Sequence, residues 1–271
     1  MKTRVLVLGS TGMLGSAVAR HFMSKSSYEV TTTYRNKAYA FGDNPIRFDA
    51  LTDPITLLST EFDYVINCIG TIKPHMAADP QAAIRLNALL PWELADWCRA
   101  GNMNLIHIST DCVYSGAKGK YVESDVHDAP DDYGKSKSLG ECSQKAMVLR
   151  TSVIGEELHH HLSLLDWAKQ QKGKTVGGFS THLWNGVTTN MYARVCEQIM
   201  ENGWYETGLF HVHAADDVNK FEMLHMFNKK FDLNMTIEEK TPAGVDRTLR
   251  TEKSLNGRLA IPTVAEMIEQ L

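Results

Sequence analysis

The chain has 271 residues, of which 43% are apolar and 22% are charged. This length suits one large domain or two small ones, and the composition excludes a disordered, collagen-like or coiled-coil protein. A formal net charge of −4 gives no general attraction to nucleic acid or to an anionic membrane. The five cysteines include no CxxC pair, and the apolar run at the N-terminus is too short for a signal peptide or a membrane span. We therefore expect a cytoplasmic protein with reduced thiols and no metal site.

The first half of the chain alternates short β-branched runs with longer helical patterns. Strands are predicted over 5–8, 29–33, 64–69, 105–108 and 147–151, and the helices between them include 17–23 and 82–99. This alternation favours βαβ units and a parallel sheet with helices on both faces. Because βαβ crossovers are right-handed, the expected fold class is α/β with a doubly wound Rossmann sheet.

The pattern changes after residue 155. The sequence predicts a helix over 162–171, a glycine-rich loop over 172–180, a strand over 209–213, a helix over 219–230 and a short helix after Pro262. We therefore expect residues 1–155 to form a nucleotide-binding domain and residues 156–271 to form a smaller α/β substrate-binding lobe.

A glycine-rich turn follows the first predicted strand directly and opens the first helix. Its glycines permit a tight turn, a close approach of the backbone to a pyrophosphate, and close packing of the helix on the strand. The N–H groups of the helix N-terminus then bind the phosphates. The turn predicts a dinucleotide site built from Gly9, Thr11, Gly12, Met13, Leu14 and Gly15.

The residue after the second predicted strand indicates which dinucleotide binds. An NAD site usually has a carboxylate about 20 residues after the glycines, where it accepts hydrogen bonds from the ribose. Here Arg35 stands twenty residues past Gly15, and Lys37 follows it. Because a guanidinium binds phosphate oxygens bidentately, we expect NADPH as the cofactor, with NAD as the second option.

Three further side chains suggest carbonyl chemistry. Thr110 follows a predicted strand, at the end of an open α/β sheet where ligands bind, and Tyr133 and Lys137 share one helix face because they are four residues apart. An ammonium near a phenol favours the phenolate, and a hydroxyl polarises a carbonyl by donating to its oxygen. The pattern predicts ketone reduction, with Tyr133 as proton donor, Lys137 as the cation that tunes it, and Thr110 as hydroxyl donor.

In this order, the motifs resemble the extended short-chain dehydrogenase/reductase superfamily, and within it the dTDP-4-dehydrorhamnose reductase-like enzymes. The matching segments are GSTGMLG, FDALTD, VINCIG, LNALLP, STDCVYSG, YGKSK, LRTSVIG and WNGVTT, within residues 9–189. The resemblance implies NADPH-dependent reduction of a 4-keto-6-deoxy sugar nucleotide in glycan precursor biosynthesis. It also implies that the segment of about 187–212 rejoins the nucleotide-binding domain. Whether the protein is a homodimer is left open by the sequence.

The resemblance assigns roles to single residues as well. Thr110, Tyr133 and Lys137 match the catalytic positions of the family. Beyond the glycine turn and Arg35, the implied cofactor residues are Asp49, Ala50, Cys68, Ile69, Gly70, Asn87, Tyr133 and Lys137, and the implied substrate residues are Cys112, His161, Trp184 and Asn185.

Two other functions stay open on the sequence alone. Cys112 replaces an aromatic residue usual in the family and has the spacing from Thr110 found in enzymes of the GDP-fucose synthase type, where a cysteine and a histidine epimerise carbons beside the keto group. The histidine would come from 159–161. The other function is that of a non-catalytic regulator like the methionine adenosyltransferase beta subunit, against which the intact catalytic positions argue.

Overall fold

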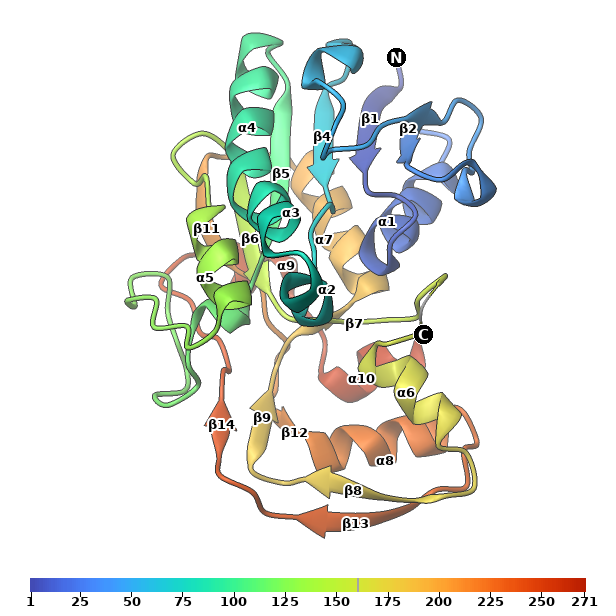
Figure 1. Cartoon of the computed structure of the whole chain (residues 1–271), viewed down its shortest axis with the longest axis vertical. Coiled ribbons are helices and arrows are strands. Elements are labelled where there is room, and N and C mark those ends of the chain that lie inside the picture. Colours follow the sequence, from blue (N-terminus) through green and yellow to red (C-terminus); the bar gives the residue numbers. More distant parts are fainter. Residues whose placement is uncertain (160) are drawn as a thin grey trace.

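The computed structural model describes residues 1–159 and 161–271. A parallel seven-stranded sheet forms the upper body of the molecule in Figure 1, with the strand order β11-β6-β5-β4-β1-β2-β3. Its strands are β1 (Thr3–Leu8), β2 (Tyr28–Tyr34), β3 (Ile46–Arg47), β4 (Tyr64–Asn67), β5 (Asn104–Thr110), β6 (Met147–Thr151) and β11 (Gly208–His211). The predicted Rossmann-type sheet is confirmed.

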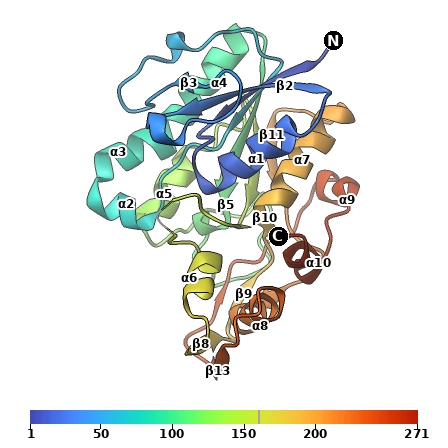
Figure 2. The same cartoon turned by 90° about the vertical axis from the view of Figure 1, so that its right-hand side faces the viewer.

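Helices cover both faces of this sheet. They are α1 (Met13–Met23), α2 (Lys73–Ala78), α3 (Pro80–Ile84), the π-helical turn η3 (Arg85–Leu89), α4 (Leu90–Ala100), α5 (Asp132–Leu139) and α7 (Thr189–Glu201), with the short turns η1 (Lys37–Tyr39), η2 (Ile55–Leu57) and η4 (Asp111–Val113). Figure 2 shows α1 and α7 on one side of the sheet and α2 and α3 on the other. Along β1, Val5 therefore joins the core under α1 and α7, whereas Leu6 joins the core under α4, as expected for a strand buried on both faces.

The helix predicted over 82–99 is divided in the structure by the π-helical turn η3. Pro91 has no N–H to donate to the carbonyl of Asn87 four residues earlier, and the π-type turn lies at this break in the hydrogen-bond pattern. The Asn87 carbonyl oxygen lies 1.9 Å from the point where a Cβ on Gly140 would stand. Only glycine at 140 therefore lets the end of α5 approach this turn.

A smaller lobe lies below the sheet in Figure 1. Its strands form three small sheets: β8 (Thr175–Phe179) with β13 (Thr236–Lys240); β12 (Val218–Asn219) with β9 (His182–Trp184) and β14 (Val245–Asp246); and β7 (Val153–Ile154) with β10 (Val187–Thr188). Its helices are α6 (Leu164–Gln170), α8 (Lys220–Lys230), α9 (Leu255–Leu259) and α10 (Val264–Glu269). The predicted loop over 172–180 is wrong, because its centre forms β8. A Cβ on Gly178 would lie 2.9 Å from the Cα of Phe221, so this glycine allows close packing on α8.

The chain returns to the sheet after entering the smaller lobe. β11 pairs with β6 from Gly208 opposite Met147 to His211 opposite Arg150, and α7 packs against α1. The core cluster beneath α1 continues into the smaller lobe, where it includes Phe227 of α8 and Met267 of α10. The domain bounds stay a prediction. Within the described part of the chain, no helix is long and apolar enough to cross a membrane.

Candidate active site

The glycine turn joins β1 to α1 at the carboxyl edge of the sheet. Gly9 has a φ of +74°, and a Cβ on Gly15 would lie 2.1 Å from the carbonyl oxygen of Gly9, so side chains at these positions would force the turn apart. Gly12 begins the helix, is exposed, and has no side chain capping its N–H groups. This bare N-terminus of an eleven-residue helix fits the pyrophosphate of a dinucleotide.

Hydrogen bonds fix the end of β2 to the glycine turn. The backbone N–H of Gly9 donates to Oγ1 of Thr33 at 3.0 Å, and the Ser10 hydroxyl donates to the carbonyl of Thr33 at 2.6 Å. β2 ends at Tyr34, and Arg35 follows as an exposed side chain. Arg35 thus stands beside the glycine turn, where we expect the 2′-phosphate of NADPH.

The other predicted cofactor residues follow the next strands of the sheet. Asp49 and Ala50 come after β3, where the Asp49 carboxylate accepts the backbone N–H of Leu51 at 3.1 Å. The segment 68–70 follows β4, and the backbone nitrogen of Ile69 lies 3.0 Å from the Cβ point of Gly9. The chain after β4 therefore runs along the glycine turn.

The predicted catalytic residues meet at the end of β5. Tyr133 and Lys137 are both on α5. The Lys137 ammonium donates to the carbonyl of Ile108 at 2.9 Å, and the Tyr133 phenol lies near enough to the Thr110 hydroxyl for that hydroxyl to lower its pKa. Thr110 in turn donates to the Asp111 carboxylate at 3.1 Å. The structure therefore brings together the hydroxyl, the phenol and the ammonium that the sequence predicts.

Burial dominates the electrostatics of these groups. Burial lowers the pKa of the Lys137 ammonium to about 8, while the nearby Glu141 carboxylate opposes this shift. Burial raises the pKa of the Tyr133 phenol, and the neighbouring Thr110 hydroxyl acts in the opposite direction. The site therefore holds a phenol that keeps its proton at neutral pH and a lysine that titrates within reach of neutral pH.

A buried ion pair lies behind Lys137. Arg150 on β6 is fully buried and binds Glu141 through two hydrogen bonds, one of them from Nε to Oε1 at 2.8 Å. The Ser109 hydroxyl donates to the same carboxylate. The guanidinium also contacts the Tyr114 hydroxyl and the rings of His127 and His211. Sequence reasoning missed Glu141, because it lies beyond the end of α5 at Leu139, where helical spacing gives no signal.

Asn87 acts through its neighbours. It is fully buried, and its amide nitrogen donates to the Ser136 hydroxyl at 3.1 Å and to the Thr71 carbonyl at 3.2 Å. Its amide oxygen accepts the backbone N–H of Thr71 at 2.9 Å. Asn87 thereby ties the segment after β4 to α5, and a direct contact with a cofactor stays a prediction.

An epimerase function would need Cys112 as a base and a histidine from 159–161 as its partner. Cys112 follows Thr110, and its backbone N–H donates to the Thr110 hydroxyl at 3.2 Å; burial raises the pKa of its thiol to about 12. His161 pairs with Asp166, at 3.4 Å, and His159 stacks on Tyr39. His160 lies outside the described residues. A protonated thiol is a weak base, so the arrangement does not favour the epimerase function.

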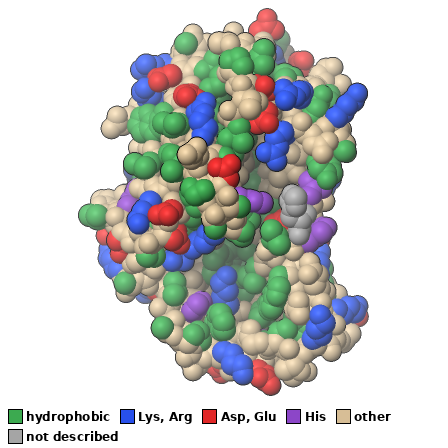
Figure 3. Space-filling model, viewed as in Figure 1, with side chains coloured by type: hydrophobic (Ala, Val, Ile, Leu, Met, Phe, Trp, Pro, Cys, Tyr) green, Lys and Arg blue, Asp and Glu red, His purple; other side chains and the backbone are tan. Residues whose placement is uncertain are grey.

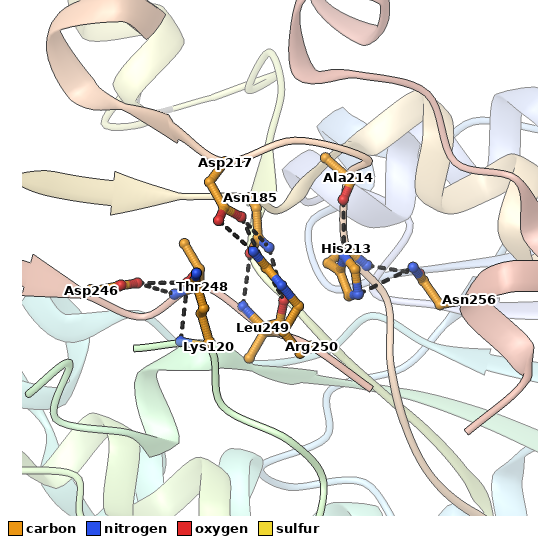
Figure 4. A network of polar contacts seen from close by, with 10 residues as sticks. All are labelled: Lys120, Asn185, His213, Ala214, Asp217, Asp246, Thr248, Leu249, Arg250 and Asn256. Atoms are coloured by element: carbon orange, nitrogen blue, oxygen red, sulfur yellow. Dashed lines mark hydrogen bonds and ion pairs between the residues drawn. The ribbon is translucent and has the colours of Figure 1, made fainter. Parts of the chain in front are cut away.

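Trp184 and Asn185 lie at the junction of the two lobes and are buried. The Asn185 amide nitrogen donates to Asp217 at 3.0 Å and to the Leu249 carbonyl at 2.9 Å, and its oxygen accepts the Leu249 N–H at 2.9 Å (Figure 4). Arg250 pairs with the same Asp217. Asn185 therefore holds the segment around Leu249 in place, and its predicted contact with substrate stays a prediction.

Comparison with known proteins places this site in a family. The model of the family described as RmlD substrate binding domain matches residues 3–254. Methionine adenosyltransferase 2 subunit beta of Danio rerio is 29% identical over 250 residues, which cover 85% of this chain and 74% of the relative. dTDP-4-dehydrorhamnose reductase of Aggregatibacter actinomycetemcomitans is 26% identical over 242 residues, which cover 81% of this chain and 76% of the relative.

Solved structures share the fold. A dTDP-4-dehydrorhamnose reductase from Bacillus anthracis in complex with NADP has a TM-score of 0.77 at 17% identity, covering 99% of this chain and 98% of that chain. MoeE5 in complex with UDP-glucuronic acid and NAD has a TM-score of 0.78 at 17% identity, covering 98% of this chain and 96% of that chain. These matches confirm the predicted fold and the predicted oxidoreductase class. The family model covers nearly the whole chain, and the chain belongs to the RmlD substrate binding domain family.

Proposed function

We propose that the protein reduces the C4 keto group of a 4-keto-6-deoxy sugar nucleotide with NADPH, as a step in making a glycan precursor. The observation that carries the proposal is the meeting of Thr110, Tyr133 and Lys137 at the sheet edge that also bears the glycine turn. The similarity to a dTDP-4-dehydrorhamnose reductase supports this substrate class. The bare glycine turn and Arg35 would hold the dinucleotide, which supplies the hydride.

Each catalytic side chain has one task in this reaction. The Thr110 hydroxyl donates a hydrogen bond to the carbonyl oxygen and stabilises the charge that develops there. The Tyr133 phenol gives that oxygen its proton. The Lys137 ammonium favours the resulting phenolate, because an opposite charge nearby favours the ionised form.

The test is NADPH oxidation by the purified protein with dTDP-, UDP- and GDP-linked 4-keto-6-deoxy sugars. We expect turnover with at least one of them. The similarity to the methionine adenosyltransferase subunit makes a regulatory function the second candidate. An absence of turnover with every sugar, together with retained binding of NADPH, would favour that second function.

Arg35 is expected to select NADPH over NADH. Replacing Arg35 by Ala removes a charged hydrogen-bond donor to the 2′-phosphate, so the Kd for NADPH should rise about 10- to 100-fold. The Kd for NADH should change little. Fluorescence titration with both dinucleotides measures this, with Arg99→Ala, an exposed change on α4, as control. Equal changes for the two dinucleotides would contradict the role of Arg35.

The activity should fall at alkaline pH. The pKa of Lys137 is lowered to about 8, so the ammonium is present below this pH and lost above it. Since the ammonium stabilises the phenolate that forms as Tyr133 gives up its proton, kcat/KM for reduction should fall about tenfold per pH unit above pH ~8. A pH profile of initial rates checks this. A profile that stays level to pH ~10 would show that the charge of Lys137 is not needed.

A further inference from the structure

The buried guanidinium of Arg150 uses every hydrogen-bond donor it has. A guanidinium carries five N–H groups and no acceptor. Nε and Nη2 donate to the two oxygens of Glu141. Nη1 donates to the Tyr114 hydroxyl and to Nε2 of His211 at 2.7 Å, and Nη2 also donates to Nε2 of His127 at 2.6 Å. These five residues form what we call the guanidinium cluster.

The guanidinium fixes the protonation of the two histidine rings. Because it can only donate, Nε2 of His127 and Nε2 of His211 are the accepting nitrogens, and the ring protons lie on Nδ1. The Nδ1–H of His211 then donates to the carbonyl of Arg250 at 2.6 Å, an oxygen that can only accept. The Nδ1–H of His127 donates to the Ser138 hydroxyl at 2.5 Å. Both imidazoles are therefore neutral in this arrangement.

The guanidinium cluster is tied to both elements that carry catalytic side chains. On β5, the Ser109 hydroxyl donates to Oε1 of Glu141 at 2.5 Å, and Ser109 directly precedes Thr110. On α5, Ser138 accepts the imidazole N–H and directly follows Lys137. The hollow that could admit a substrate lies between the sheet body and the smaller lobe (Figure 3), whereas the guanidinium is fully buried. The cluster thus reaches the catalytic elements from within the protein.

His127 is the ring of the guanidinium cluster that water can reach. Its side chain is 28% exposed. His211 is fully buried, and burial lowers its pKa to about 4. In mild acid, a proton added to the cluster therefore goes to His127.

Several charged or titratable groups face the His127 imidazole. Burial lowers the pKa of the ring, the Glu141 carboxylate raises it, Arg150 lowers it and Asp128 raises it. The Tyr114 ring stands edge-on to the imidazole, with the ring centroids 5.7 Å apart. The net direction is a pKa below the usual value of about 6.5, so the ring is neutral near pH 7.

Protonation of His127 breaks its bond to Arg150. A proton on Nε2 would face an N–H of Arg150 at 2.6 Å, where neither atom can accept. Oε2 of Glu141 lies 3.5 Å from Nε2 and can accept that proton once the ring turns. Since the same ring holds Ser138 through Nδ1, the turn would disturb the bond between the imidazole and α5.

We propose that His127 is a positioning residue for the reduction: its neutral imidazole ties α5 to Arg150, and protonation in mild acid releases this tie and lowers kcat. The inference rests on the proposed function, because it concerns how α5 places Tyr133 and Lys137 against Thr110. KM should change little, since His127 acts through the helix. The acid side of the pH profile then depends on His127, and the alkaline side on Lys137.

The kinetic test breaks the tie from each side. His127→Gln keeps an acceptor for Arg150 but has no group in place of Nδ1, and Ser138→Ala removes the acceptor of the Nδ1 proton. At pH ~7.5, each change should lower kcat about three- to tenfold, the effect of one hydrogen bond, with KM unchanged. The double variant should lose no more than either single variant. Below pH ~6.5, the unchanged protein should approach this lower kcat, whereas the variants should show no such fall.

His225→Gln is the matched control, because His225 is an exposed histidine of α8. It should keep the kcat and the pH profile of the unchanged protein. The same fall of kcat in acid in His127→Gln as in the unchanged protein would overturn the inference. Losses that add up in the double variant would do so as well.

Nitrogen NMR of the histidine rings tests the tie without relying on activity. At neutral pH, the His127 ring should carry its proton on Nδ1, and the backbone amide signals of α5 should shift as this ring is protonated. In Ser138→Ala, the α5 signals should not follow the ring. Should His127→Gln fail to fold, Ser138→Ala and this titration decide.

A proton on Nε2 of His127 at neutral pH, or α5 signals that do not follow the ring in the unchanged protein, would contradict the inference. The proposed function fails in a different way. An absence of NADPH oxidation with every sugar nucleotide, beside the expected NMR behaviour, would refute the proposed reduction and leave the tie between His127 and α5 standing.

Discussion

Replacing Tyr133 by Phe is expected to lower kcat for sugar-nucleotide reduction by about 10²- to 10⁴-fold, the usual contribution of a positioned general acid. The change removes the only atom of this ring that can give a proton to the carbonyl oxygen. The ring itself, half-buried on α5, is preserved, so the fold should be unchanged. Initial rates at saturating NADPH measure the effect.

Tyr205→Phe is a suitable control for this experiment. The Tyr205 hydroxyl accepts the backbone N–H of Leu105 at 3.2 Å, at the amino end of the strand whose carboxyl end carries Thr110. Loss of this hydroxyl should leave kcat within about twofold of the unchanged protein, since only one neutral hydrogen bond far from the chemistry is removed. Equal rates for Tyr133→Phe and the unchanged protein would refute the proposed role of Tyr133.

Replacing Arg150 by Met is expected to lower the free energy of unfolding by about 3–5 kcal/mol, the usual cost of breaking a buried ion pair from one side. The side chain of Arg150 is fully buried, and the side chain of its partner Glu141 is only 6% exposed. The substitution leaves the Glu141 charge in this environment without its cation. Urea unfolding followed by tryptophan fluorescence measures the loss.

A double variant separates the ion pair from simple packing. Arg150→Met combined with Glu141→Gln removes both charges, so it should be more stable than Arg150→Met alone. Lys137 should also lose the support of the Glu141 charge, which lowers its pKa further. A loss below about 1 kcal/mol for Arg150→Met would show that the pair contributes little to stability.

The parts of the site that the sequence predicts correctly are those whose residues are close in the chain. The glycine turn is predictable because the turn, the strand before it and the helix after it lie within residues 3–23. Tyr133 and Lys137 are predictable because a helix alone places residues four apart on one face. Thr110 is predictable because ligands bind at the carboxyl ends of the strands in an open α/β sheet.

The parts that the sequence does not predict depend on contacts between distant segments. Thr175–Phe179 contains two neighbouring glycines and was expected to be a loop, yet it pairs with β13 some sixty residues later. Lys220, which begins α8, and Arg247, which follows β14, interact electrostatically with Asp111, the residue after Thr110. No local pattern marks either of them, since a lysine after a helix cap is usually an exposed residue.

The seven-stranded sheet of the nucleotide-binding half is complete only when β11 has joined it. Until residue 211 has been synthesised, β6 has no neighbour on its outer side, because β11 is the strand that pairs with it. A ribosome-bound chain, or a fragment cut near residue 155, therefore presents an unpaired strand edge, which can pair with other chains. It also lacks α7, and so leaves the apolar face that includes Val5 and Phe22 without part of its cover. The first half is therefore not expected to fold stably before β11 and α7 are present.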